Sequence, residues 1–341
     1  MRRPVLLPLV PLYAAGSALR NLALGFGWAK IRSLYHPVIS IGNLSTGGSG
    51  KTPFAMSLAR LFTARGFKVD VLSRGYGRES SEPAQVRLYG NAEQFGDEPL
   101  LIARETGVPV FVAKKRYDAG RLAESEIHHL GGQTRVHILD DGFQHRQLFR
   151  DIDILLIDRN DWRDHLLPAG NLREGWGSIQ RANVLAIPAD DPAFEAELRK
   201  TWSGPLWRVR RIMETPHVSE PVVAFCGIAR PEQFLVGLKS AGLSLADKVI
   251  FSDHHRYSAH DVERLISLAR KRNATALVTT DKDEVRLGNF ASDFPSWLPL
   301  KTASLRVEIE DEEAAMTWLE KEIIRTHAAR EHRNISYKHA S

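Results

Sequence analysis

The sequence predicts an α/β protein with a doubly wound, mostly parallel sheet and a second, smaller α/β domain. Residues 36–190 repeat apolar strand, turn and helix at close spacing, which is typical of a parallel sheet covered by helices on both faces. Near 205–220 this pattern changes. Segments 206–212 and 222–226 predict two strands that form a linker between domain 36–205 and domain 206–325.

The first predicted strand, 38–41, leads into a glycine-rich turn that ends in Gly50-Lys51-Thr52. Glycines let successive backbone N–H groups surround a phosphate, and the positive end of the following helix faces the anion. The strict phosphate-loop pattern has Gly where this chain has Ser45. We still predict a nucleoside-triphosphate site of the P-loop NTPase type. Its residues are Ser45, Thr46, Gly47, Gly48, Ser49, Gly50, Lys51 and Thr52.

Arginines follow the next predicted strands. A helix at 53–65 leads to strand 68–73 and then to Arg74-Gly-Tyr-Gly-Arg78, and strand 109–113 leads to Lys114-Lys115-Arg116. Open α/β sheets bind ligands at the carboxyl ends of their strands, and arginine matches phosphate geometry. Both runs are therefore candidate anion contacts, although solvated turns are the alternative. Asp97 and Glu98 begin a helix that reaches about residue 106, where first-turn acids are common.

An apolar strand at 135–139 ends in Asp140-Asp141. A strand that closes on Asp after a phosphate loop is typical of a Mg²⁺ site, so Thr52 and Asp140 or Asp141 are the candidate metal ligands. Strands at 152–157 and 184–187 follow, separated by a polar loop at 167–174.

The second domain is predicted to contain strands at 248–251 and 276–279 and helices at 231–241 and 259–272. Its Asp253-His254-His255 run leaves three interpretations open, namely a metal site, proton transfer across a domain cleft, and exposed loop histidines. Residues 326–341, rich in His and Arg, are expected to form a frayed basic tail.

Composition limits the partners. The chain has 341 residues, a net charge of +5 and one cysteine, which excludes an internal disulfide framework and fits a reducing compartment. Cys226 lies in an apolar run and is expected to be buried. Residues 1–35 are apolar and basic without Asp or Glu, but prolines at 4, 8 and 11 disfavour a straight helix there. From 12 to 34 the pattern fits either an amphipathic segment on a membrane or a helix packed on the core.

Taken together, these motifs resemble the tetraacyldisaccharide 4′-kinase family, the lipid A kinases of Gram-negative bacteria. They occur in order over about residues 38–290: Ser40-Ile-Gly-Asn-Leu-Ser-Thr-Gly-Gly-Ser-Gly-Lys-Thr-Pro53, Ser73-Arg-Gly-Tyr-Gly-Arg78, Gly96-Asp-Glu-Pro99, Asp140-Asp-Gly-Phe-Gln-His145, Leu167-Pro-Ala-Gly-Asn-Leu-Arg-Glu174, Gly227-Ile-Ala-Arg-Pro231, Asp253-His254 and Thr280-Asp-Lys-Asp283. The family's loop also lacks the first strict glycine, so Ser45 does not count against the assignment.

The resemblance implies a kinase that uses ATP and Mg²⁺ to phosphorylate the 4′-hydroxyl of an acylated glucosamine disaccharide 1-phosphate at the cytoplasmic face of the bacterial inner membrane. It favours a membrane-associated segment at 1–35, peripheral or monotopic. Asp97 is the candidate base, by resemblance and by its predicted strand-end position, and His254 would support it. Lys51 and Arg116 complete the catalytic candidates. Candidate substrate contacts are Arg74, Arg78, Glu98, Arg173 and Glu174.

Two other classes remain as alternatives. A P-loop switch or partition-type ATPase shares the loop, but many carry an additional Lys early in it, and residues 43–46 contain none. A guanine-reading [NT]-K-x-D is also missing, since residues 280–284 read Thr-Asp-Lys-Asp-Glu. A nucleic-acid ATPase would suit the basic charge, but no alternation of aromatic and basic residues supports it, so we expect no nucleic-acid partner.

Overall fold

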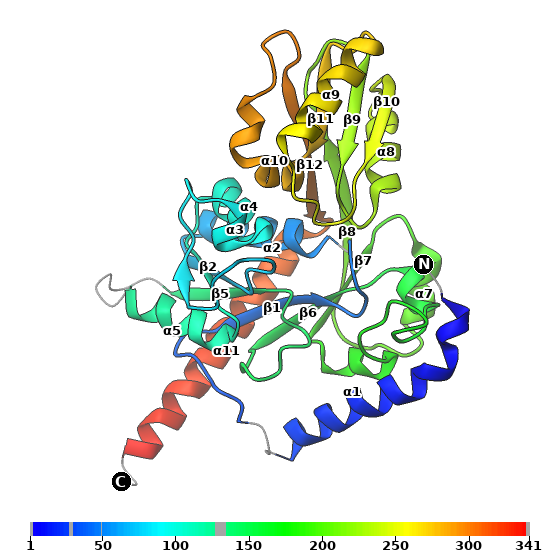
Figure 1. Ribbon diagram of the computed structural model, residues 1–341. Coiled ribbons are helices and arrows are strands. Elements are labelled where there is room, and N and C mark those ends of the chain that lie inside the picture. Colours follow the sequence, from blue (N-terminus) through cyan, green and yellow to red (C-terminus); the bar gives the residue numbers. More distant parts are fainter. Residues whose placement is uncertain (1–2, 27–29, 49, 127–133, 339–341) are drawn as a thin grey trace.

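The computed structural model describes residues 3–26, 30–48, 50–126 and 134–338 (Figure 1). Twelve strands within these ranges form one continuous sheet in the order β10-β9-β11-β12-β8-β7-β6-β1-β5-β2-β4-β3. The strands are β1 (Val38–Asn43), β2 (Lys68–Ser73), β3 (Ala84–Gln85), β4 (Val110–Val112), β5 (Arg135–Asp140), β6 (Ile152–Leu156), β7 (Val184–Pro188), β8 (Leu206–Glu214), β9 (Val222–Cys226), β10 (Leu245–Ile250), β11 (Ala276–Thr280) and β12 (Leu300–Ile309).

Strand β1 lies at the point where the direction of strand order changes. It pairs in parallel with β5 on one side and with β6 on the other, and β2, β4, β7 and β8 extend the parallel array outward. Only β3 runs antiparallel in this part of the described sheet. The doubly wound, mostly parallel fold is therefore confirmed, and its ligand crevice is expected beyond the carboxyl end of β1.

Helices cover both faces of this sheet. The core on one face joins strands to α2 (Lys51–Ala64), α4 (Asp97–Thr106) and α11 (Glu312–Lys338), while α5 (Arg116–Glu126), η2 (Trp176–Arg181) and α7 (Pro192–Leu198) cover the other face. Two single-turn helices, α3 (Ala92–Phe95) and α6 (Arg159–Trp162), lie in loops. Every residue of β1 is buried, which is expected of a central parallel strand.

The second part of the sheet has helices on both faces as well. Strands β10, β9, β11 and β12 run parallel, with α8 (Pro231–Ser240) against one face and α9 (Ala259–Lys271) against the other. Helices α10 (Asp281–Leu287) and η3 (Gly288–Ser292) follow β11. Cys226 is buried in this core, as expected.

The link between the two parts differs from the prediction. Strand β8 pairs antiparallel with β12, from Glu214 opposite Ser304 to Val209 opposite Ile309. Segment 222–226 does not pair with β8, because as β9 it lies between β10 and β11. The prediction that segments 206–212 and 222–226 together form the linker was wrong, because strand 300–309, the partner of β8, was not recognised. The domain limits 36–205 and 206–325 remain a proposal.

Both ends of the chain also differ from expectation. Residues Pro4–Leu9 form the 3₁₀-helix η1, which tolerates the prolines, and α1 follows as Val10–Gly25 rather than extending to residue 34. Within the described residues, no helix is both long and apolar enough to cross a membrane. The expected frayed tail is helical as far as Lys338, since 312–338 contains neither Pro nor Gly.

Candidate active site

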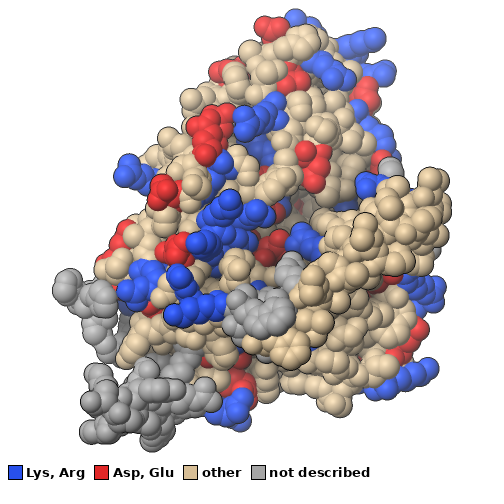
Figure 2. Space-filling model, turned by 60° about the horizontal axis from the view of Figure 1, so that its bottom comes forward, with Lys and Arg blue, Asp and Glu red and all other residues tan. Residues whose placement is uncertain are grey.

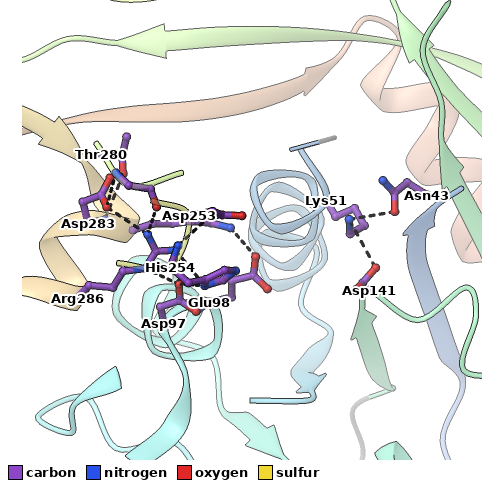
Figure 3. Close-up of polar contacts among 12 residues, drawn as sticks. Asn43, Lys51, Asp97, Glu98, Asp141, Asp253, His254, Thr280, Asp283 and Arg286 are labelled. Atoms are coloured by element: carbon purple, nitrogen blue, oxygen red, sulfur yellow. Dashed lines mark hydrogen bonds and ion pairs between the residues drawn. The ribbon is translucent and has the colours of Figure 1, made fainter. Parts of the chain in front are cut away.

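The phosphate loop connects β1 to α2. Gly47, Gly48 and Gly50 have φ angles of 87°, 34° and 82°, a region that side chains with a Cβ rarely adopt. Lys51 begins α2, and its Nζ lies 3.0 Å from the Asn43 Oδ1 and 3.5 Å from the Asp141 Oδ1 (Figure 3). Ser45, Thr46 and Thr52 also belong to the described loop, whereas Ser49 lies outside the described residues. A glycine-rich loop whose backbone N–H groups surround an anion, together with the Lys51 ammonium group, suits a triphosphate.

Asp140 and Asp141 stand beside this loop because β5 pairs with β1, with Ile41 opposite Asp140. Burial, followed by the charges of Glu98 and Asp141, raises the pKa of Asp140 to about 7. Its Oδ1 is buried without a hydrogen-bond partner among the described residues. Burial opposes ionisation of Asp141 too, but Lys51 and Arg173 outweigh it and lower its pKa.

Asp140 and Asp141 suit a Mg²⁺ ion that is also bound by phosphates and water, rather than a metal ion bound by protein ligands alone. The described residues contain no group of three or more His, Cys, Asp or Glu arranged to hold a metal. Mg²⁺ usually takes one or two carboxylates and obtains its remaining oxygens from substrate phosphates and water. A buried carboxylate oxygen without a donor, close to Lys51 and Thr52, suits that pattern.

Asp97 lies on the other side of the site. It is the first residue of α4 and follows α3, so our placement of it at a strand end was wrong. Its Oδ2 accepts hydrogen bonds from Arg286, at 2.7 Å from Nε, and lies 3.1 Å from the His254 Nδ1 (Figure 3). Burial favours the neutral acid, but His254, Arg286 and Lys282 outweigh it and hold the pKa of Asp97 below its usual range.

The position of His254 favours the proton-transfer interpretation of the Asp253-His254-His255 run. The hydrogen bond with Asp97 raises the pKa of His254, against partial burial and the charge of Arg286. His255 instead lies 3.1 Å from the Asp261 Oδ2 and stacks on Phe251. The two imidazoles therefore do not converge on one point, and His254 has the geometry expected of a residue that assists proton transfer.

Sequence reasoning missed Lys282 and Arg286 as functional residues. Both project from α10 toward α4: Lys282 pairs with Glu98 at 2.5 Å, and the Arg286 guanidinium, 6% exposed, contacts Asp97 and Asp283. Their i, i+4 spacing on one helix was the available signal, because such residues share a face. Both contacts join the two parts of the sheet.

The predicted basic residues divide into two sets. Arg116 is buried, and burial lowers its pKa to about 10, with Arg74 lowering it further and Asp141 raising it. Arg173 Nη1 donates to both oxygens of Asp141 at 3.0 Å, and Arg74 is exposed and close enough to Arg116 for its charge to act on it. These three therefore lie near the phosphate loop.

Two further predicted substrate contacts, Arg78 and Glu174, have protein partners. Arg78 donates to the Glu82 carbonyl at 2.5 Å, and Glu174 is buried in an ion pair with Arg181 at 2.5 Å. Arg78 Nη1 is buried without a hydrogen-bond partner among the described residues.

A loop of the second part also covers the phosphate loop. A Cβ on Gly47 would lie 3.3 Å from the Ala229 Cβ, and one on Gly48 would lie 2.7 Å from the Arg230 Cδ. Arg230 also approaches Asp158 at 3.4 Å. The glycines thus serve both the loop conformation and close contact with residues 229–230.

Fold and site together define a P-loop phosphotransferase whose two parts each contribute to the site. A model of the family described as tetraacyldisaccharide-1-P 4′-kinase matches residues 2–324. The chain is 40% identical over 319 residues to the tetraacyldisaccharide 4′-kinase of Koribacter versatilis, covering 91% of this chain and 96% of the relative. It is 36% identical over 331 residues to that of Aquifex aeolicus, covering 92% and 96%.

A solved structure supports the same assignment. The crystal structure of LpxK from Aquifex aeolicus in complex with ATP matches with a TM-score of 0.74 and 34% identity, over 94% of this chain and 98% of that one. The chain belongs to the tetraacyldisaccharide 4′-kinase family.

Proposed function

We propose that this protein transfers the γ-phosphoryl group of ATP to the 4′-hydroxyl of tetraacyldisaccharide 1-phosphate. Family membership supports the activity, and one observation supports the mechanism. The candidate base Asp97 is ionised and hydrogen-bonded to His254, on the opposite side of the site from the Lys51 loop. Phosphoryl transfer depends mainly on positioning and charge neutralisation, which this arrangement supplies.

Each candidate residue then has a role. Lys51 and the loop amides bind the outer phosphates, with Arg116 and Arg173 adding positive charge close by. Thr52 and Asp140 or Asp141 hold Mg²⁺, which neutralises charge on the phosphates when bound. As the 4′-oxygen bonds to the γ-phosphorus and ADP leaves, the hydroxyl proton passes to Asp97, and His254 stabilises the carboxylate that receives it.

Arg74 and Glu98 are the remaining substrate candidates near the site. Arg74 is exposed, follows β2, and suits the 1-phosphate of the acceptor. Glu98 is held by Lys282 and orders the side of the site that carries Asp97. Glu174 is paired with Arg181 and is expected to support its neighbouring segment, whereas Arg78, whose Nη1 is buried without a partner among the described residues, stays a candidate contact of the acceptor.

We further propose that η1 and α1 lie on the cytoplasmic face of the inner membrane. Their exposed large apolar side chains include Val5, Leu7, Leu9, Leu12, Leu19 and Leu22, and the exposed Phe26 directly follows α1. The sequence of η1 and α1 contains one charged residue, Arg20, and Figure 2 shows Lys and Arg side chains gathered beside this segment. An exposed apolar helix next to a basic surface favours an interface that carries anionic lipid.

The test is one incubation of the purified chain with labelled ATP, Mg²⁺ and the lipid disaccharide 1-phosphate. The expected product carries a second phosphate and forms only when ATP, Mg²⁺ and the lipid are all present. ATP hydrolysis that proceeds equally without the lipid would favour the switch-type ATPase instead. Deletion of residues 1–30 should reduce sedimentation with anionic vesicles, and unchanged sedimentation would contradict the membrane proposal.

A further inference from the structure

The loop that follows α6 connects the N-terminal segment to the phosphate loop. On one side, the Tyr13 hydroxyl of α1 donates to the Arg173 carbonyl at 3.1 Å, and the Arg3 N–H donates to the Ala169 carbonyl at 2.7 Å. These bonds attach both η1 and α1 to residues 165–173, which we call the bridging loop.

On its other side, the bridging loop forms a short antiparallel ladder with the start of the phosphate loop. The Arg173 N–H donates to the Leu44 carbonyl at 2.7 Å, the Thr46 N–H donates to the Asn171 carbonyl at 2.8 Å, and Ser45 lies opposite Leu172. Backbone bonds of this kind fix the path of the chain on both sides of Ser45.

The Arg173 side chain extends the connection to charged groups of the site. It donates to Asp141 at 3.0 Å, and Asp141 in turn lies 3.5 Å from the Lys51 Nζ. Tyr13, Arg173, Asp141 and Lys51 thus form an unbroken series of hydrogen bonds and ion pairs. It leads from a helix with an apolar exposed face to the group expected to bind phosphate.

Helix α1 has two faces that suit this arrangement. Its half-buried residues are Val10, Tyr13, Ala14 and Ser17, which follow helical spacing and lie toward the body of the protein. Its exposed large apolar side chains, including Leu12, Leu19 and Leu22, lie on the other face. Lipid can therefore cover the outer face while the Tyr13 bond on the inner face stays intact.

We propose that Tyr13 is a positioning residue that couples the seating of α1 on a lipid surface to phosphate binding, through Arg173 and the bridging loop. The proposal rests on the membrane contact and the ATP site of the proposed function. Contact with lipid restricts the motion of α1. When α1 moves less, it holds the bridging loop and the phosphate loop in the arrangement that binds triphosphate. Because such coupling is reciprocal, lipid and ATP should each strengthen binding of the other.

The first test measures the ATP dissociation constant with and without vesicles of phosphatidylglycerol and phosphatidylethanolamine, in the absence of acceptor. Vesicles should tighten ATP binding about fivefold in the wild type, the scale of one hydrogen bond, and less than twofold in Tyr13→Phe. Tyr89→Phe, which changes a fully exposed tyrosine, is the matched control and should behave as the wild type. Vesicle flotation of Tyr13→Phe should stay unchanged, whereas Leu12→Asp should reduce it.

A double-mutant cycle tests the route. Tyr13→Phe should lower kcat/KM for ATP on vesicle-borne acceptor about fivefold in the wild type but less than twofold in Arg173→Ala, with KM for the acceptor unchanged. The coupling is refuted if vesicles leave the ATP affinity of the wild type unchanged, or if Tyr13→Phe has the same effect in the wild type and in Arg173→Ala. It is also refuted if Tyr13→Phe no longer floats with vesicles. Failure of the wild type to phosphorylate the acceptor would refute the proposed function, while the affinity test would still decide the coupling.

Discussion

Replacement of Asp97 by Asn tests the assignment of the base most directly. The side chain is 6% exposed, and its Oδ2 is shared by Arg286 and His254. Asn keeps the shape but removes the charge and the site that receives the proton. A general base typically contributes 10²- to 10⁴-fold, so kcat should fall by that factor, or about 3–5 kcal/mol in the barrier. KM for ATP should change little, because other residues form the phosphate loop.

The same substitution has a calculable effect on stability. Arg286 loses a charged acceptor but keeps Asp283 at 3.2 Å and the Gly227 carbonyl at 2.5 Å. A hydrogen bond to a charged group contributes about 1.5–3 kcal/mol, and the free energy of unfolding should fall by that amount at neutral pH. The folded pKa of Asp97 is lowered, so its contribution is fully present above the ordinary pKa of 3.8 and is lost as the pH falls through the folded value. The gap between variant and wild type should therefore shrink in acid.

The assay needs a control variant that weakens the contacts of Arg286 but leaves the candidate base unchanged. Asp283→Asn removes the other carboxylate that holds Arg286 without altering the candidate base. Urea unfolding and steady-state rates at saturating ATP and lipid acceptor should show that both variants are less stable, while only Asp97→Asn loses more than about threefold in kcat. The reasoning fails if Asp97→Asn keeps kcat within threefold, or if Asp283→Asn loses as much as Asp97→Asn.

Three further predictions concern neighbouring groups. Lys51→Met should lower kcat/KM for ATP about 10²- to 10³-fold, the cost of losing one group that stabilises developing charge, and near-normal initial rates would contradict the phosphate-loop assignment. Asp140→Asn should raise the Mg²⁺ concentration for half-maximal rate at least about tenfold in a Mg²⁺ titration, and an unchanged midpoint would exclude Asp140 as a ligand. In Asp97→Asn the pKa of His254, followed by NMR, should fall toward 6.5, because the bond that raises it is lost while Arg286 remains; a constant value would show another cause.

The fold was predictable where local sequence determines structure. The strands around β1 are continuous apolar runs that end in turns, so their existence and parallel order followed from spacing. The partner of β8 was not predictable in that way. Strand β12 has alternating exposure and lies far along the chain, and its pairing depends on which edge the second part of the sheet presents.

The site shows the same division. Lys51, Thr52 and Asp140 belong to local motifs whose chemistry requires those residue types at fixed positions, and the structure brings them together. Arg286 belongs to no such motif. Only the fold places α10 beside α4, and this contact sets the charge around Asp97. The helix start at Asp97 was predicted correctly and its strand-end position was not, while its selection as base came from the resemblance.

The arrangement of the two parts explains why neither would be expected to work alone. Asp97 and Glu98 from α4 meet Arg286 and Lys282 from α10, and Ala229 and Arg230 lie against the phosphate-loop glycines. Side-chain contacts of this kind need the two parts to hold one relative position to within a fraction of an ångström. The backbone ladder of β8 and β12 supplies that constraint, because it makes the sheet continuous across the junction. Asp97, which we propose as the proton acceptor, can then keep a fixed position relative to the phosphate loop.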